Sequence, residues 1–181
     1  MNHEAKAVLL ITGASRGIGA ATALLAGARG YAVGVNYRND DRAAEAVVRQ
    51  IEQAGGMAVA LQADVAREQD VLDMFEACAH RLGAITGLVN NAGILEMDRI
   101  RRVFETNVFG TMLCAREAVR RMATSTGGSG GGIVNVSSAA SRLGSPGEYV
   151  DYAAAKGAVD TLTIGLAKEV AAEGIRVNAV R

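Results

Sequence analysis

Short apolar runs of strand length alternate with longer amphipathic stretches along the whole chain, and this alternation constrains the fold most strongly. Strands separated by helices of about 10 to 20 residues form βαβ units and pair as a parallel sheet. The apolar runs have no polar face, as a sheet covered by helices on both sides requires. The sequence therefore predicts an α/β fold, a doubly wound parallel sheet with helices on both faces. The predicted strands are 7–11, 32–35, 57–62, 87–89, 133–136 and 175–180, and the predicted helices are 18–29, 40–54, 68–81, 99–122 and 149–173.

The composition narrows the class of protein. A chain of 181 residues, 50% hydrophobic and 21% charged, has enough apolar material for one folded domain, 1–181, and too much to be disordered. The 19 basic and 19 acidic residues cancel. Net charge therefore gives no reason to expect nucleic acid or an anionic membrane as a partner.

The N-terminal residues, the apolar runs and the cysteines indicate the cellular location of the protein and the redox state of its thiols. The N-terminus has no charged-then-apolar signal pattern, and the longest apolar runs have about six residues, against ~20 for a membrane span. Cys78 and Cys114 lie far apart in predicted helices. This arrangement is typical of buried, reduced thiols rather than of a disulfide or a metal site. We expect a cytoplasmic protein with no membrane association and no metal.

A glycine-rich segment, Thr12–Gly19, stands between the first predicted strand and the first predicted helix with the spacing G-x3-G-x-G. Gly13 allows a tight turn, Gly17 lets backbone N–H groups approach a pyrophosphate at the helix N-terminus, and Gly19 permits close packing of helix on strand. A glycine-rich turn without a ligand is the alternative, but the position after the first strand argues against it. The segment therefore predicts a Rossmann-like dinucleotide site.

The end of the second strand bears on the choice of dinucleotide. An acid there would bind the ribose 2′-OH of NAD, but the sequence reads Asn36-Tyr37-Arg38. Arg38, together with Arg16 of the glycine segment, could bind a 2′-phosphate through its planar guanidinium. The sequence therefore favours NADP(H) over NAD(H). The alternative is that Arg38 is a solvated surface charge.

Four later segments follow strands or open a helix near the same sheet edge: Asp64-Val65, Asn90–Gly93, Ser137-Ser138 and the pair Tyr152 and Lys156. All are expected at the carboxyl ends of the strands, where open α/β sheets bind ligands.

Tyr152 and Lys156 stand four residues apart and therefore share one face of the last predicted helix. A tyrosine has an ordinary pKa of about 10, and a nearby ammonium stabilises its phenolate, which makes it a usable acid or base near neutral pH. Tyr149 has Ala153 in the corresponding position and thus lacks such a partner.

With these residues, the sequence resembles the short-chain dehydrogenase/reductase family, and especially bacterial glucose dehydrogenases and 3-oxoacyl-carrier-protein reductases. The matching residues occur in the family's order over nearly the whole chain: Thr12–Gly19, Asp64, Asn90–Gly93, Asn107, Ser138, Tyr152 and Lys156.

The resemblance implies a mechanism. Tyr152 would be the general acid/base, Lys156 would lower the pKa of Tyr152 and hold the nicotinamide ribose, and Ser138 would stabilise charge on the substrate oxygen. Asn107 would hold the water of a proton relay. Ser137 competes with Ser138, and the second serine of such a pair is preferred because the family's catalytic serine usually stands there.

The resemblance also implies partners. The substrate would be a small carbonyl compound or alcohol, and the helices 99–122 and 149–173 would pair across subunits in a homotetramer or homodimer. The residues expected at the cofactor are Gly13, Ser15, Arg16, Gly17, Ile18, Gly19, Asn36, Arg38, Asp64, Val65, Asn91, Ala92, Gly93, Tyr152 and Lys156.

The chain departs from the family's pattern in two places. Between Gly93 and Asn107 it is shorter by about ten residues, with the join expected near 95–97. After Arg181, members of the family continue for about 60 to 70 residues with the last strand and a substrate cover. Either the protein is truncated, or the sequence holds only the ordered residues of a longer chain. The second explanation is preferred because both gaps fall on segments that the family uses as mobile covers.

Three functions compete. The first is an NADP(H)-dependent oxidoreductase that interconverts a carbonyl and a secondary alcohol, which Asn107, Ser138, Tyr152 and Lys156 support together. The second is a non-catalytic dinucleotide-binding sensor or scaffold, which the missing substrate cover favours. The third is a Rossmann-like methyltransferase, in which a Tyr-x3-Lys pair would have no role.

Overall fold

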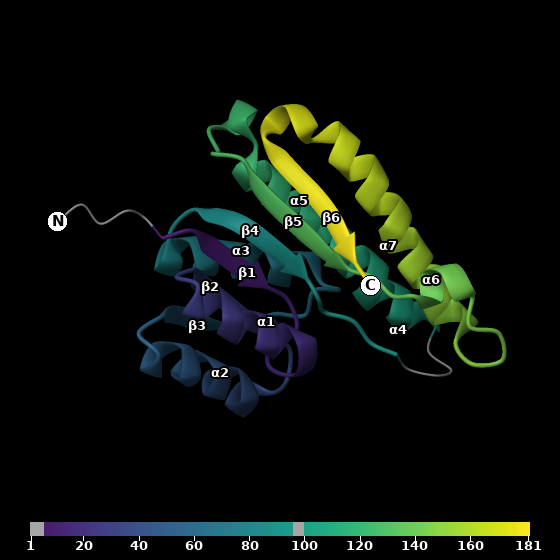
Figure 1. The fold of residues 1–181 in the computed structure, drawn as a ribbon, viewed down its shortest axis with the longest axis horizontal. Helices are drawn as coiled ribbons and strands as arrows, with labels where there is room; N and C mark the ends of the chain where they lie inside the picture. The colour runs from purple at the N-terminus through teal and green to yellow at the C-terminus, as the bar shows by residue number, and fades with distance from the viewer. Residues whose placement is uncertain (1–5, 96–99) are drawn as a thin grey trace.

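A computed structural model describes residues 6–95 and 100–181. Its centre is a six-stranded parallel sheet in the order β3-β2-β1-β4-β5-β6 (Figure 1). The chain therefore starts in the middle of the sheet, builds one half outward to β3, returns to β1 and builds the other half outward to β6. The strands are β1 Val8–Ile11, β2 Ala32–Tyr37, β3 Met57–Gln62, β4 Ile85–Asn90, β5 Gly131–Val136 and β6 Ile175–Val180.

Helices cover both faces of this sheet, as predicted. In β1, the neighbouring residues Leu10 and Ile11 are both fully buried, and each belongs to a different core cluster. One core packs β-sheet side chains against α3 and α5, and the other packs them against α1 and α2 (Figure 1). The α-helices are α1 Gly17–Ala28, α2 Asp41–Gln53, α3 Glu68–Leu82, α4 Ile100–Phe104, α5 Gly110–Met122, α6 Ala140–Leu143 and α7 Val150–Glu169.

The fourth predicted helix, 99–122, is interrupted. Its first residue lies outside the described residues, and the rest forms α4, a π-helical turn η1 (Glu105–Phe109) and α5. A π turn inserts one extra residue per turn, which apolar periodicity does not reveal, and such turns are frequent at functional sites. The predicted shortening near 95–97 also falls largely outside the described residues, which resume at Ile100.

Two other boundaries differ from the sequence prediction. The strand predicted at 133–136 begins two residues earlier, because Gly131 and Gly132, the end of a glycine- and serine-rich segment, belong to β5, and a Cβ on Gly131 would lie 2.4 Å from the carbonyl oxygen of Thr86. Glycine stands there because two backbones approach closely, not because the chain is flexible. The last predicted helix ends at Glu169 and is followed by the 3-10 turn η3 (Ala171–Glu173); η2 (Thr124–Thr126) and α6 were not predicted.

None of the helices within residues 6–95 and 100–181 combines the length and the apolar composition that crossing a membrane requires.

Candidate active site

The loop between β1 and α1 is built around close backbone approaches. Gly13 and Gly17 have φ of +62° and +57°, in the left-handed region that favours glycine. A Cβ on Gly13 would lie 2.9 Å from the Cα of Ala92, and one on Gly19 would lie 2.5 Å from both the Gly13 carbonyl and Nδ2 of Asn91. Gly19 therefore brings α1 against the loop itself, whereas the sequence prediction was packing against the strand.

Side-chain hydrogen bonds join this loop to the loop after β4. Oγ1 of Thr12 accepts from the backbone N–H groups of Asn91 and Ala92, both at 3.0 Å. In return, Nδ2 of Asn91 donates to the carbonyls of Thr12 and Gly13, both at 2.9 Å. Asn91 thus holds the backbone of the loop. Thr12 was not among the predicted site residues, because its role as a double acceptor depends on a loop about eighty residues away.

Asn36 makes the corresponding connection to β3. Its Oδ1 accepts from the N–H of Gly13 at 3.0 Å, and its Nδ2 donates to the carbonyls of Leu61 and Ala63 at 3.1 and 3.2 Å. The side chain is 2% exposed. Asn36 therefore fixes the loops around the site through its amide, with both polar atoms engaged inside the protein.

The N-terminus of α1 offers backbone donors toward the same region. Arg16 occupies the N-cap position of α1, but its side chain makes no capping hydrogen bond. The first turn of α1 contains no acidic residue. Space is open around Gly17, since a Cβ there would meet no atom within 4 Å. Uncapped N–H groups and the positive end of a helix dipole are suited to a phosphate or pyrophosphate.

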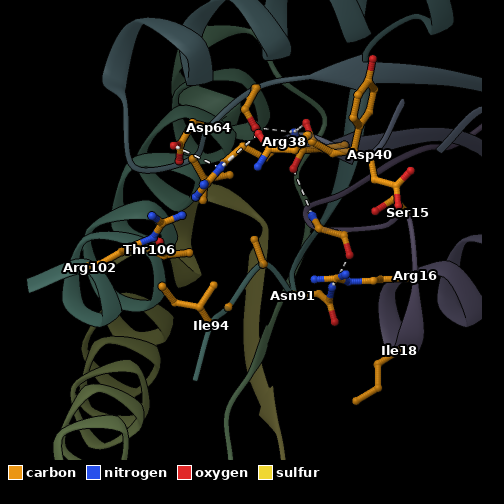
Figure 2. A pocket seen from close by; sticks show the side chains of 18 residues that line it. Ser15, Arg16, Ile18, Arg38, Asp40, Asp64, Asn91, Ile94, Arg102 and Thr106 are labelled. Carbon is orange, nitrogen blue, oxygen red and sulfur yellow. Dashed lines mark hydrogen bonds and ion pairs between the residues drawn. The ribbon is translucent and has the colours of Figure 1, made fainter. Parts of the chain in front are cut away.

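A cavity of about 480 Å³ opens in front of these loops (Figure 2). Arg38 and Asp64 lie at one end of it, and Arg16 and Ile18 lie opposite Arg102. Gly17, Gly19, Tyr152 and Lys156 are not among its lining residues. The predicted cofactor residues that line it are Gly13, Ser15, Arg16, Ile18, Asn36, Arg38, Asp64, Val65, Asn91, Ala92 and Gly93, joined by Tyr37, Asn39, Asp40, Ala63, Ile94, Arg102 and Thr106.

The cavity is lined by both basic and acidic side chains, and one such pair is in contact. Nε of Arg38 lies 3.7 Å from Oδ2 of Asp64, and both side chains remain partly exposed. The carboxylate of Asp64 is further held by the backbone two residues later, because its Oδ1 accepts from the N–H of Ala66 at 3.1 Å. Arg38 is therefore anchored beside the cavity by a carboxylate and still reaches solvent.

The four predicted catalytic residues come from three segments. Asn107 lies in the π turn η1 and is fully buried; its amide accepts from the N–H of Ile94 at 2.8 Å and donates to the carbonyl of Ile94 at 2.9 Å. Ser138 follows β5, half-buried, and its Oγ accepts from the N–H of Ala140 at 3.2 Å. Tyr152 and Lys156 lie in the first two turns of α7.

Lys156 is the centre of this group. Its Nζ donates to the carbonyl of Val136 at 2.7 Å and lies 5.6 Å from the centroid of the Tyr152 ring. A Cβ on Gly93 would lie 3.3 Å from Oδ1 of Asn107 and 3.7 Å from Nζ of Lys156, so these residues converge on one point. Burial lowers the pKa of Lys156 to about 8, against the opposing attraction of the Asp160 carboxylate.

The two serines after β5 differ in how far they are exposed to solvent. Ser137 is 6% exposed, and its hydroxyl is one of the groups that lower the pKa of Asp160. Ser138 is the more accessible of the two. This difference favours Ser138 for contact with a bound molecule.

No group of three or more His, Cys, Asp or Glu side chains that could hold a metal ion occurs in the part of the chain that the structure describes.

Comparison with known proteins agrees with a dinucleotide-binding fold that carries an oxidoreductase site. Residues 7–181 match the family model for short chain dehydrogenases. The chain is 59% identical to the uncharacterized oxidoreductase YgfF of Escherichia coli (strain K12), over 97% of this chain and 74% of that protein. It is 40% identical to a 3-oxoacyl-[acyl-carrier-protein] reductase of Synechocystis sp., over 96% of this chain and 72% of that protein.

Solved structures are similar throughout the described fold. A mutant of a Serratia marcescens short-chain dehydrogenase/reductase has a TM-score of 0.89 at 30% identity, covering 99% of this chain and 75% of that one. A short chain dehydrogenase from Mycobacterium avium has a TM-score of 0.89 at 33% identity, covering 96% of this chain and 66% of that one.

Proposed function

Because the chain belongs to the short-chain dehydrogenase family, we propose that it interconverts a small carbonyl compound and its secondary alcohol, with NADP(H) preferred over NAD(H) and Tyr152 as general acid/base. Family membership makes the protein an oxidoreductase acting on CH–OH groups with a nicotinamide cofactor. The finer parts of the proposal, which are the cofactor preference and the role of each residue, rest on the geometry of the site.

The convergence of Lys156, Asn107 and Gly93 beside Tyr152 is the observation that carries the proposal. The residues around the cavity fit a dinucleotide, because the uncapped N-terminus of α1 and the open space at Gly17 suit a pyrophosphate. When bound, a nicotinamide cofactor supplies or accepts the hydride.

The protein's own residues would manage the proton. Tyr152 would donate a proton to the substrate oxygen during reduction and take one from the alcohol during oxidation. The ammonium of Lys156, whose Nζ lies 5.6 Å from the centroid of the Tyr152 ring, would stabilise the negative charge that develops on the phenolic oxygen during proton transfer. Ser138 would donate a hydrogen bond to the substrate oxygen as charge develops there. Asn107, held at both ends of its amide by Ile94, would keep the π turn in place for a proton-relay water.

Replacing Tyr152 tests the mechanism. Tyr152→Phe keeps the ring and removes the hydroxyl, so turnover should fall by at least about a hundredfold, while NADPH still binds. Tyr149→Phe is the matched control, because that ring packs edge-on against Tyr152 at 5.8 Å and has no lysine one turn later. NADPH oxidation and fluorescence titration measure the two properties separately. Substantial turnover in Tyr152→Phe would refute the assignment.

The cofactor preference is proposed from two cations that line the cavity, Arg16 and Arg38. If Arg38 binds the 2′-phosphate of NADP(H), Arg38→Ser should raise the KM for NADPH about tenfold or more and leave the KM for NADH nearly unchanged. Arg49→Ser, at an exposed position of α2, is the control. Equal effects on both cofactors would contradict the proposal.

The substrate should be sought among sugars, 3-oxoacyl thioesters and simple ketones, in a screen for NADPH and NADH consumption. A relative at 40% identity carries the name of a 3-oxoacyl-[acyl-carrier-protein] reductase, which supports including the thioesters. Micromolar NADPH binding without any turnover would favour a sensor or scaffold instead.

A homotetramer or homodimer and a cytoplasmic location complete the proposal. Exposed apolar side chains on the expected pairing helices, Phe109 and Met112 before and in α5 and Ile164 in α7, support association. Light scattering at micromolar concentration tests it, and a monomer would refute it.

A further inference from the structure

A carboxylate on α7 lies next to the proposed catalytic group and has no part in the mechanism above. Asp160 stands four residues after Lys156, one turn further along the same face of the helix. Its side chain is 16% exposed, and its Oδ2 lies 3.1 Å from Nη2 of Arg181, directly after β6. A half-buried carboxylate in such a position requires an explanation, because loss of solvent disfavours an ionised group.

The surroundings of Asp160 hold it ionised. Burial alone would raise the pKa of this carboxyl, but the hydroxyls of Ser137 and Ser141 and the guanidinium of Arg181 outweigh burial and lower it. Oδ1 of Asp160 and Oγ of Ser137 are both buried and, within residues 6–95 and 100–181, lack a partner at full hydrogen-bond geometry. The carboxylate is therefore fixed by one ion pair and keeps unused acceptor capacity toward the end of β5.

Lys156 is the group whose protonated form this negative charge favours. It is 5% exposed, and its ammonium donates a hydrogen bond to a neutral acceptor, the Val136 carbonyl. A buried ammonium with only neutral partners would lose its proton at lower pH than an exposed one. The other charged groups on the elements packed against α7 are Arg101 and Arg102 on α4, Glu105 on η1, Arg142 on α6, Arg176 on β6, Arg181 directly after β6 and Glu173 on η3. The helix α7 itself also carries Asp151, Lys168 and Glu169. Arg102 and Glu105 line cavities on the side of Arg38. In the described chain, Asp160 is the carboxylate that favours the charged form of Lys156.

We propose that Asp160 is a positioning residue whose fixed negative charge keeps Lys156 protonated beside Tyr152, and that Arg181 and Ser137 hold this carboxylate in place. The inference extends the proposed function, since it concerns the lysine of that mechanism. The charge of Lys156 can be measured directly in the protein without cofactor or substrate, so the effect of Asp160 on Lys156 can be tested independently of activity.

The measurement uses the small number of lysines in the chain. Lys6, Lys156 and Lys168 are the only three, and Lys6 and Lys168 are exposed. Lysine labelled with carbon-13 at the ε position gives three NMR signals whose shifts report protonation, and Lys168→Arg assists the assignment. In the unaltered protein, the Lys156 signal should titrate with a midpoint near the pKa of about 8, well below the 10.5 of an ordinary lysine.

Two variants separate charge from structure. Asp160→Asn removes the charge and keeps the shape, so the Lys156 midpoint should fall. Arg181→Gln breaks the same ion pair and leaves the carboxylate charged, so the midpoint should not fall. Asp160→Glu should restore the original value. Asp160→Ser serves as a second neutral variant if Asp160→Asn does not fold.

The same variants have a kinetic signature. In the carbonyl-reduction direction, kcat of Asp160→Asn should be nearly unchanged at pH 6.5 and about threefold lower at pH 8.5, because the alkaline limb moves to lower pH. An unchanged Lys156 midpoint in Asp160→Asn, or an equal fall in Arg181→Gln, would overturn the inference. Absence of turnover in the unaltered protein would refute the proposed function, and the NMR titration would still decide the role of Asp160.

Discussion

Replacing the buried lysine should stabilise the fold while it removes activity. Lys156 is 5% exposed, and burial lowers its pKa from 10.5 to about 8. Each tenfold change in the protonation equilibrium corresponds to about 1.4 kcal/mol, so keeping this side chain charged in the folded state costs about 3 kcal/mol. Lys156→Met removes that cost at similar length and flexibility.

Part of this gain is offset by a lost hydrogen bond. The ammonium donates to the Val136 carbonyl at 2.7 Å, and leaving that acceptor without a partner costs about 1 kcal/mol. The net expectation is a gain of about 2 kcal/mol at pH 7, which raises Tm by about 4 to 8 °C in a chain of this size.

The pH dependence distinguishes this explanation from better packing. The folded pKa is lower than the unfolded one, so the unfolded chain binds more protons between about pH 8 and 10.5, and the stability of the unaltered protein rises with pH there. The destabilisation is complete below about pH 8 and disappears as the pH approaches 10.5. The advantage of Lys156→Met should therefore be full at pH 7 and largely gone by pH 9.5.

Urea denaturation followed by circular dichroism at both pH values measures this difference in the protein without ligand. Lys168→Met, at an exposed position of the same helix, is the control and should change the free energy of unfolding by less than about 0.5 kcal/mol. A variant that is less stable than the unaltered protein at pH 7, or an advantage that persists unchanged at pH 9.5, would refute the reasoning.

Three further predictions concern the backbone of the site. Gly19→Ala places a Cβ 2.5 Å from the Gly13 carbonyl, so calorimetry should find NADPH binding weakened at least about tenfold; unchanged affinity would show that the loop adjusts. Gly157→Ala, in α7 where a Cβ meets no atom within 4 Å, should instead raise the free energy of unfolding by about 0.5 to 1 kcal/mol, and a loss would contradict the helix geometry. Asn36→Asp replaces a buried donor with an acceptor facing two carbonyls, so urea denaturation should show a loss of about 1 to 3 kcal/mol.

The fold could be predicted because its determinants are local and repeated. Apolar runs of strand length between amphipathic helices indicate a parallel sheet wherever they occur, and all six predicted strands are present. The interruption of the helix 99–122 by a π turn could not be predicted, since the helical period of apolar residues continues through it. The strand position of Gly131 also depends on contact with Thr86, which lies forty-five residues away.

Residue identity and spacing by themselves determined the fold class, the family and the residue types available for chemistry, because these follow from local periodicity and short motifs. Tertiary structure decided what each side chain does. Asn36, which the sequence assigns to the cofactor, has its amide engaged by the backbone of the loop after β1 and of the end of β3, and Asp160 gains its proposed role only where α7 meets the ends of β5 and β6. The physical reason is that burial and opposing charge set the state of a group, and both arise from residues far away in the sequence.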